Sequence, residues 1–188
     1  MDELRDEIYG WSLNLVKNGF RLEAIFLFLS TWNIAAFRYA MRRFRIEEFK
    51  RALESCDFEF FRSRKFESTD LMDTEVVKKT EEIYEALSRF DGVKYVGASK
   101  VMHLLNPEFF MMWDSKVINH YEAKRTPEGY VDFMRLMQKM WKEGKFPKPR
   151  KGETVTRAID VYNITVVPDR KGESQQQAPR PTLEQSEG

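Results

Sequence analysis

Residues 90–121 read FDGVKYVGASKVMHLLNPEFFMMWDSKVINHY, and this stretch decides the fold that the sequence predicts. A glycine-bearing turn comes first. A short helix is predicted over residues 97–105, with Lys100 in its first turn. The helix ends at Asn106-Pro107, because proline disfavours the helical conformation in the residue before it.

The loop that follows carries five large apolar side chains in a row, residues 109–113. These side chains must be buried, because exposing them together to water is unfavourable. Asp114 comes directly after the loop and is predicted to cap a helix that runs through residue 121. Burial of the loop would therefore fix the position of Asp114 relative to Lys100.

Apolar residues recur at helical spacing on both sides of this stretch. In the first segment they are Leu4, Ile8, Trp11 and Leu15, and in residues 33–44 they are Ile34, Phe37 and Met41. A further helix is expected from a cap at Asp73 or Thr74 to residue 90. The remaining predicted helices cover residues 21–31, 46–53, 129–141 and 154–167, although the last four residues, ITVV, could equally form a strand.

The chain is thus predicted to be all-α, with one compact multi-helix domain over residues 1–167. Residues 168–188, PDRKGESQQQAPRPTLEQSEG, contain a single large apolar residue. Such a segment buries too little surface to offset its ordering entropy, so we expect a disordered tail. A partner-binding role for this tail is the alternative.

Composition excludes several classes of protein. The chain has 188 residues with a net charge of +1, and 42% of them are hydrophobic, enough for a sizeable core. One cysteine and two histidines exclude a disulfide framework and argue against a zinc site. The acidic start, MDELRDEIYG, is no signal peptide, and the longest apolar stretch is too short for a bilayer. We expect a cytoplasmic protein without metal, cofactor or membrane contact.

Basic residues gather in two segments of this nearly neutral chain. Residues 38–51 and residues 142–157 each hold six basic and two acidic side chains. Basic clusters neutralise phosphates, so these segments are candidates for contact with a DNA backbone. The alternative is that they are only the solvated faces of helices. The candidate contacts are Arg38, Arg42, Arg43, Arg45, Lys148, Arg150 and Lys151.

The central stretch resembles the core of the helix-hairpin-helix DNA glycosylases. In that superfamily a hydrophobic-Gly-Val-Gly turn precedes a helix, a lysine follows the turn in lyase-competent members, and an aspartate later caps the next helix. Val96-Gly97-Ala98-Ser99-Lys100 and Asp114-Ser115-Lys116-Val117 stand at these places. Residues 157–162 are also similar to the closing helix of some archaeal members. This chain departs from the pattern in having one glycine there, unless Gly92 is the first, and in a shorter separation of lysine and aspartate.

The resemblance implies a DNA-repair glycosylase, with or without AP-lyase activity, acting on a damaged base. Lys100 would attack the sugar of an extruded nucleotide, and Asp114 would stabilise the developing positive charge. His103 would orient one of these two residues. Phe110 and Trp113 would stack on the base, and the backbone amides around Gly97 would hold a phosphate at the start of a helix.

Two other interpretations of the same residues remain. The chain could be a non-catalytic helical domain that binds nucleic acid through its basic clusters, or a protein-interaction domain. Lys100 would then be a surface lysine, Asp114 an ordinary helix cap, and the aromatic residues core. An enzyme requires Lys100 and Asp114 to meet at one cavity, whereas a binding domain requires the basic clusters on one face.

Overall fold

The computed structural model describes residues 3–167, and within them the chain is all-α, as predicted, with no strand. Residues 168–188, for which a disordered tail was expected, lie outside the described residues. The helices are α1 (Glu3–Lys17), α2 (Arg21–Trp32), α3 (Ile34–Ala40), α4 (Ile46–Ser55), α5 (Thr74–Ser88), α6 (Lys94–Leu105), α7 (Ser115–His120), α8 (Pro127–Lys142) and α9 (Val155–Val166), with short 3-10 turns η1 (Met41–Arg43) and η2 (Glu59–Phe61).

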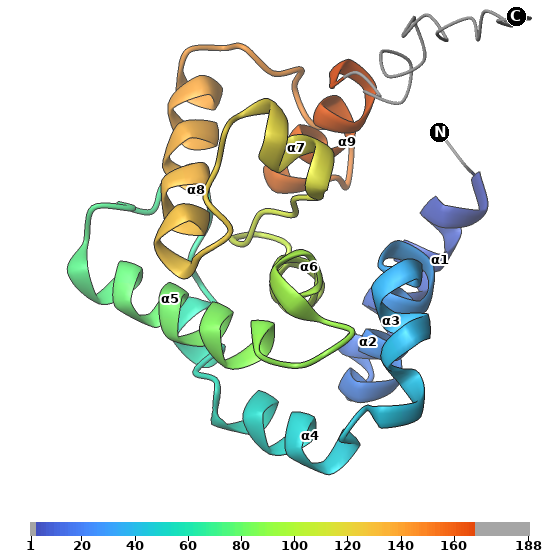
Figure 1. Ribbon diagram of the computed structural model, residues 1–188. Coiled ribbons are helices and arrows are strands. Elements are labelled where there is room, and N and C mark those ends of the chain that lie inside the picture. Colours follow the sequence, from blue (N-terminus) through green and yellow to red (C-terminus); the bar gives the residue numbers. More distant parts are fainter. Residues whose placement is uncertain (1–2, 168–188) are drawn as a thin grey trace, which may run out of the picture.

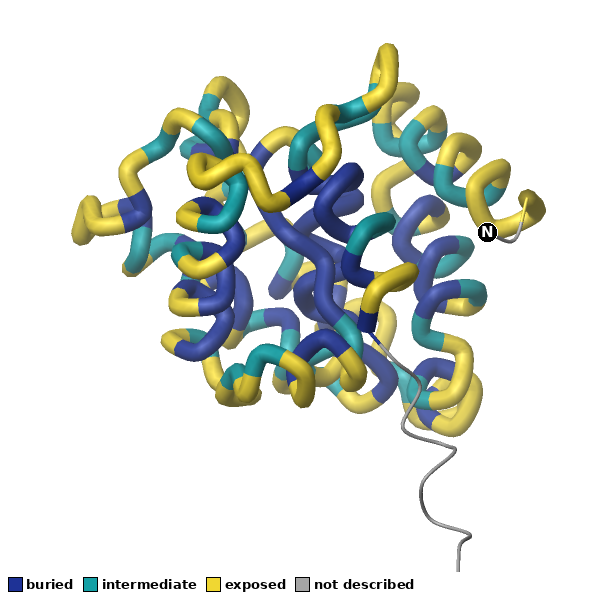
Figure 2. The backbone as a smooth tube through the Cα atoms, turned by 90° about the horizontal axis from the view of Figure 1, so that it is seen from above, coloured by how far each residue is buried: buried dark blue, intermediate teal, exposed yellow. Residues whose placement is uncertain are grey.

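Helix α6 is the central element (Figure 1), with α1 to α3 on one side of it and α5 and α8 on the other. Every residue from 97 to 104 is buried. Its first turns carry the small residues Gly97, Ala98 and Ser99, which allow neighbouring helices to approach closely. Figure 2 shows the same arrangement, with buried backbone through the middle of the molecule and exposed residues on the outer turns.

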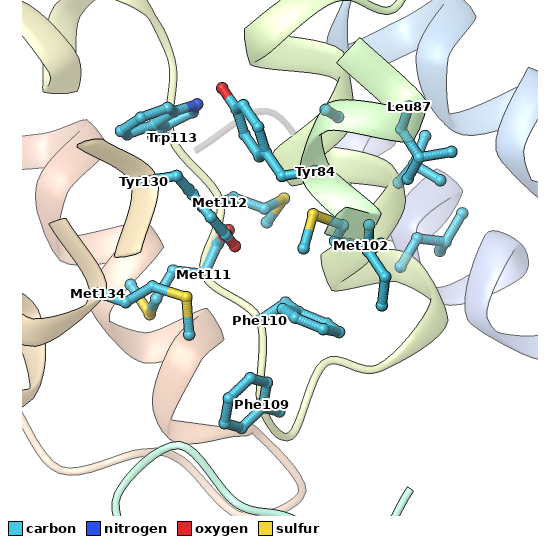
Figure 3. Close-up of a cluster of buried hydrophobic side chains, with 14 of the residues drawn as sticks. Tyr84, Leu87, Met102, Phe109, Phe110, Met111, Met112, Trp113, Tyr130 and Met134 are labelled. Carbon is cyan, nitrogen blue, oxygen red and sulfur yellow. The ribbon is translucent and has the colours of Figure 1, made fainter. Parts of the chain in front are cut away.

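The apolar loop after α6 fills the centre of the core, as predicted. Residues 109–113 are each at most 2% exposed and run in extended form beside Tyr84, Met102 and Tyr130 (Figure 3). The loop has no strand to pair with, so side chains bind its backbone. Tyr130 donates to Met111 O at 2.7 Å, and Trp113 N donates to Ser99 Oγ at 3.3 Å.

Two predicted helix caps are present in the structure. Asp73 accepts hydrogen bonds from Glu75 N and Val76 N at the start of α5. Asp114 likewise accepts from Lys116 N and Val117 N at the start of α7. Both caps confirm the predictions, because an aspartate before a helix satisfies amides that lack a partner inside the helix.

Two predicted boundaries differ from the structure by three or more residues. Helix α6 begins at Lys94 instead of residue 97, because the turn before it lies at residues 89–93, where Gly92 adopts a φ of 88°. The third helix ends at Ala40 and continues only as the 3-10 turn η1. For the segment ITVV the helix is the correct alternative, because its first three residues belong to α9 and Val167 is the residue that ends it.

Two predicted apolar faces are also wrong. Leu4 and Trp11 are each 56% exposed, and the buried position of α1 is Ser12, whose hydroxyl donates to Ile8 O. Ile34 and Met41 are each 60% exposed, whereas Phe37 between them is buried. The change to 3-10 geometry at Met41 breaks the helical period that the pattern assumed.

No single helix among residues 3–167 is both long and apolar enough to cross a membrane. The segments Arg21–Trp32 and Ile34–Arg43 pass that length and composition test only together, as a pair bent by 117°.

Asn33 ties the turn before α6 to the junction of α2 and α3. Its side-chain amide donates to Gly92 O at 2.8 Å and to Val93 O at 3.3 Å. Gly97 lies against this amide, and a Cβ there would come within 2.9 Å of Asn33 Nδ2. A side chain at position 97 would therefore displace the amide that holds the turn.

We expect Gly97→Ala to lower the free energy of unfolding by about 1–2 kcal/mol, since overpacking and loss of the Asn33 hydrogen bonds outweigh the better helix propensity of alanine. In an Asn33→Ala background the nearest obstacle is absent and only Val93 Cγ1, at 3.1 Å, stays close, so the same substitution should cost less stability. Urea unfolding of the four proteins measures this coupling. An equal effect of Gly97→Ala in both backgrounds would contradict it.

Candidate active site

A cavity of about 500 Å³ opens beside the start of α6. It contains a lysine and two aspartates from three different helices or their caps: Lys100 of α6, Asp114 before α7 and Asp160 of α9. The cavity therefore brings together the two predicted catalytic residues and a third ionisable residue that sequence reasoning missed. The other lining residues are Arg5, Trp32, Asn33, Ala35, Ala36, Val93, Lys94, Tyr95, Val96, Trp113, Ser115, Lys116 and Ile164.

Lys100 is buried, with 7% of its surface exposed. It lies in the second turn of α6, not the first as predicted, because the helix starts three residues earlier. Its Nζ donates to the carbonyl oxygen of Trp32, at the end of α2. Burial lowers the pKa of Lys100 from 10.5 to about 8, although the charges of Asp114 and Asp160 oppose this shift. A fraction of the molecules thus holds a neutral amine near neutral pH.

Asp114 is half-buried at the wall of the cavity. Its Oδ1 accepts both capping hydrogen bonds of α7, at 2.8 and 2.9 Å. Its Oδ2 accepts no hydrogen bond from the part of the chain that the structure describes. One oxygen therefore fixes the carboxylate, and the other is left for a group in the cavity.

Asp160 is buried and forms an ion pair with Arg157, one helical turn before it. Arg157 is itself 4% exposed, pairs with Asp6 at 2.7 Å and lies over the rings of Tyr9 and Trp32. Burial raises the pKa of Asp160 to about 6, against the opposing charges of Arg157 and Lys100. The sequence signal was an i, i+3 charge pair in an apolar segment, and Arg157 had been counted only as part of a basic cluster.

His103 lies outside the cavity lining and is fully buried. Its Nε2 is 2.8 Å from the hydroxyl of Tyr9 and its Nδ1 is 2.8 Å from the carbonyl oxygen of Phe110. Burial lowers the pKa of His103 to about 3, so the ring is neutral. In this structure His103 joins α1 to the loop after α6 and does not reach Lys100 or Asp114 with either ring nitrogen.

The other predicted site residues fall in different places. Trp113 lines the cavity but is almost wholly buried, while Phe110 belongs to the core. Gly97 is buried inside α6, and its amide donates to Val93 O at 2.8 Å. The expectation that amides around Gly97 hold a phosphate at a helix start is therefore wrong, since the helix begins at Lys94.

The two basic clusters are exposed but lie apart. Arg38, Arg42, Arg43 and Arg45 are on α3, η1 and the turn after it, whereas Lys148, Arg150 and Lys151 are on the connection from α8 to α9. Figure 1 shows these segments at different ends of the molecule. None of the seven residues lines the cavity. The exposed basic residues that do line it are Arg5, Lys94 and Lys116.

Within residues 3–167, no group of three or more His, Cys, Asp and Glu side chains is arranged to hold a metal ion. Comparison of the chain with protein-family models, curated proteins and solved structures finds no match.

The lowered pKa of Lys100 should be visible in stability. Between pH 8 and 10.5 the unfolded chain binds more protons at this lysine than the folded protein. The free energy of unfolding of wild type, relative to Lys100→Met, should therefore rise with pH across this window by up to about 3 kcal/mol. Lys78→Met, at an exposed lysine of α5, is the control and should show no such trend. A difference in unfolding free energy between wild type and Lys100→Met that does not change with pH would contradict the prediction.

Proposed function

We propose that this protein is a DNA glycosylase with AP-lyase activity, in which Lys100 is the nucleophile and Asp114 the stabilising carboxylate. The observation that carries the proposal is that both residues line one cavity and that the lysine is buried there. An exposed lysine is fully protonated at neutral pH and is a poor nucleophile. Burial disfavours the ammonium form, and enzymes use it to make an amine reactive.

The arrangement of α5 and α6 supports the resemblance to helix-hairpin-helix glycosylases. The two helices are joined by residues 89–93, and Gly92 and Lys94 both have positive φ, 88° and 48°. Gly92-Val93-Lys94 is therefore a better counterpart of the Gly-Val-Gly turn than the segment at Gly97, with Lys94 in the conformation that favours glycine. On this alignment Lys100 comes about one helical turn later than the family's lysine.

The chemistry follows from the two residue types. The neutral amine of Lys100 forms a bond to C1′, the bond from C1′ to the base breaks, and the base leaves with the electron pair and takes up a proton. The ionised carboxylate of Asp114 stabilises the positive charge that develops on the sugar. Opening of the sugar ring and loss of a proton from Nζ give a Schiff base. Loss of a C2′ proton then expels the 3′ phosphate, and water hydrolyses the Schiff base to restore Lys100.

The cavity also suits an extruded base in size and surroundings. Its volume of about 500 Å³ lies within the range of small-molecule sites. Trp32 and Tyr95 are aromatic residues of its lining, and aromatic side chains are expected where a base leaves the stack of the duplex. Arg5, Lys94 and Lys116 add positive charge around it, which favours phosphates.

Borohydride trapping tests the nucleophile. Wild type should form a covalent complex with a duplex that carries an abasic site. It should also form one with a duplex that carries the base it removes, which is sought in a panel of 8-oxoguanine, uracil and hypoxanthine. Lys100→Met should form none, because it has no amine. Asp114→Asn should lower the rate about 10²-fold or more, since it removes the charge but keeps a capping oxygen.

Asp73→Asn is the matched control for Asp114→Asn, because Asp73 caps α5 with the same two hydrogen bonds and does not line the cavity. It should trap at the wild-type rate. Absence of trapping and of base release with wild type on every duplex would overturn the proposed function.

The second candidate, a non-catalytic nucleic-acid-binding domain, is favoured by the exposed basic residues around the cavity. Both candidates predict DNA contact there. Lys94→Gln and Lys116→Gln should each weaken binding of an abasic duplex and reduce the slope of log K against log salt by about 1. Lys151→Gln, outside the cavity, is the control for a general charge effect. The same reduction with all three variants would show that binding is not centred on the cavity, and only trapping distinguishes the two candidates.

A further inference from the structure

This inference rests on the proposed function. The proposed reaction requires one proton to be removed and one to be supplied. Lys100 is mostly an ammonium ion below its pKa of about 8 and must lose a proton before it attacks. The departing base carries an electron pair and must gain one. Asp114 is committed to the α7 cap through Oδ1 and faces the developing charge as a carboxylate. The reaction therefore needs a further group that exchanges protons inside the cavity.

Asp160 is the remaining carboxylate of the cavity. Its Oδ2 is held by Arg157, whose position is fixed in turn by Asp6 and by the rings of Tyr9 and Trp32. Its Oδ1 accepts no hydrogen bond from residues 3–167. One oxygen is thus anchored and the other is available, which is the arrangement that a proton-transferring carboxylate needs.

Lys100 forms no ion pair with either aspartate among the described residues, and all three residues line the cavity. A sugar and base bound there would lie next to all three groups. Burial shifts the proton affinity of Asp160 towards that of Lys100, with pKa values of about 6 and about 8. Transfer between groups this close in affinity is inexpensive.

Other charged groups near this pair come from every element around the cavity. Arg5 and Asp6 of α1 lie on one side, and Lys94 of α6 and Lys116 of α7 lie at the cavity wall. Tyr9 and His103 stay uncharged near neutrality, since burial raises the pKa of Tyr9 and lowers that of His103. Lys100 and Asp160 are therefore the two residues of the cavity between which a proton can move near neutral pH.

We propose that Asp160 is a further catalytic residue, which takes the proton that Lys100 must lose before it attacks C1′ and passes it to the departing base. The carboxylate gains one proton and loses one in each excision, so it ends as it began. The amine is neutral when it attacks, its nitrogen carries the positive charge once the bond to C1′ has formed, and the base leaves in neutral form. Asp114 takes no part in this proton transfer, so the two carboxylates have separate roles.

An abasic site separates this role from a structural one, because it has no base to protonate. Asp160→Asn keeps the size of the side chain and an oxygen that accepts from Arg157. We expect it to lower the rate of excision of whichever panel base wild type removes by about 10²-fold, while trapping on an abasic duplex stays within a few-fold of wild type. Asp160→Glu, which keeps a carboxylate, should retain most of the excision rate.

Wild type alone gives a second test that requires no variant. Excision needs the pair to share one proton, so its rate should form a bell between pH about 6 and about 8. Trapping on the abasic duplex needs only the free amine and should not fall above pH 8. Excision that does not fall above pH 8 would overturn the role of Asp160.

Different outcomes would overturn the role of Asp160 and the proposed function on which it rests. Loss of abasic trapping and excision to the same extent in Asp160→Asn would overturn the transfer of a proton to the departing base, while leaving Lys100 as the nucleophile. Excision by Asp160→Asn at the wild-type rate would overturn it as well. Failure of wild type to trap or excise on any duplex would overturn the glycosylase itself.

Discussion

Burial of residues 109–113 is the constraint on which the rest of the structure depends. An extended segment inside a helical protein has no strand to satisfy its backbone, so it is stable only where side chains such as Tyr130 and Ser99 bind it. The same segment connects α6 directly to the cap of α7. Its packing therefore determines where Asp114 lies relative to Lys100, and a core interaction sets the geometry of a polar cavity.

The charged residues buried at and beside the cavity lower the stability of the folded protein. Lys100, Arg157 and Asp160 are each buried, and burial of a charge is costly unless it is paired. Arg157 meets this requirement with two aspartates and two aromatic rings, whereas Lys100 has only the Trp32 carbonyl as a direct partner among the described residues. Trp32 Nε1 is, in residues 3–167, the one buried side-chain nitrogen or oxygen without a partner. Such unmet requirements concentrate where a protein binds or transforms a ligand.

Local signals in the sequence were sufficient for the parts of the fold that depend on local physics. The caps at Asp73 and Asp114, the stop at Asn106-Pro107 and the buried loop all follow from neighbouring residues. The start of α6 did not, because Lys94 adopts a left-handed conformation that its residue type does not announce. Asp160 and Arg5 were missed since only the packing of α9 and α1 brings them to Lys100 and Asp114, and no spacing along the chain encodes that contact.

Lys100 and Asp114 each have a structural role besides the proposed catalytic one. Lys100 binds a carbonyl at the end of α2, and Asp114 caps α7. Capping alone does not require the arrangement found here, because Asp73 caps α5 equally well on an exposed surface, and a glycine or an exposed lysine can close a helix end without burying an amine. What capping leaves unexplained is that a buried lysine and two carboxylates from separate helices converge on one cavity with basic residues around it. That combination is what the proposed reaction would require.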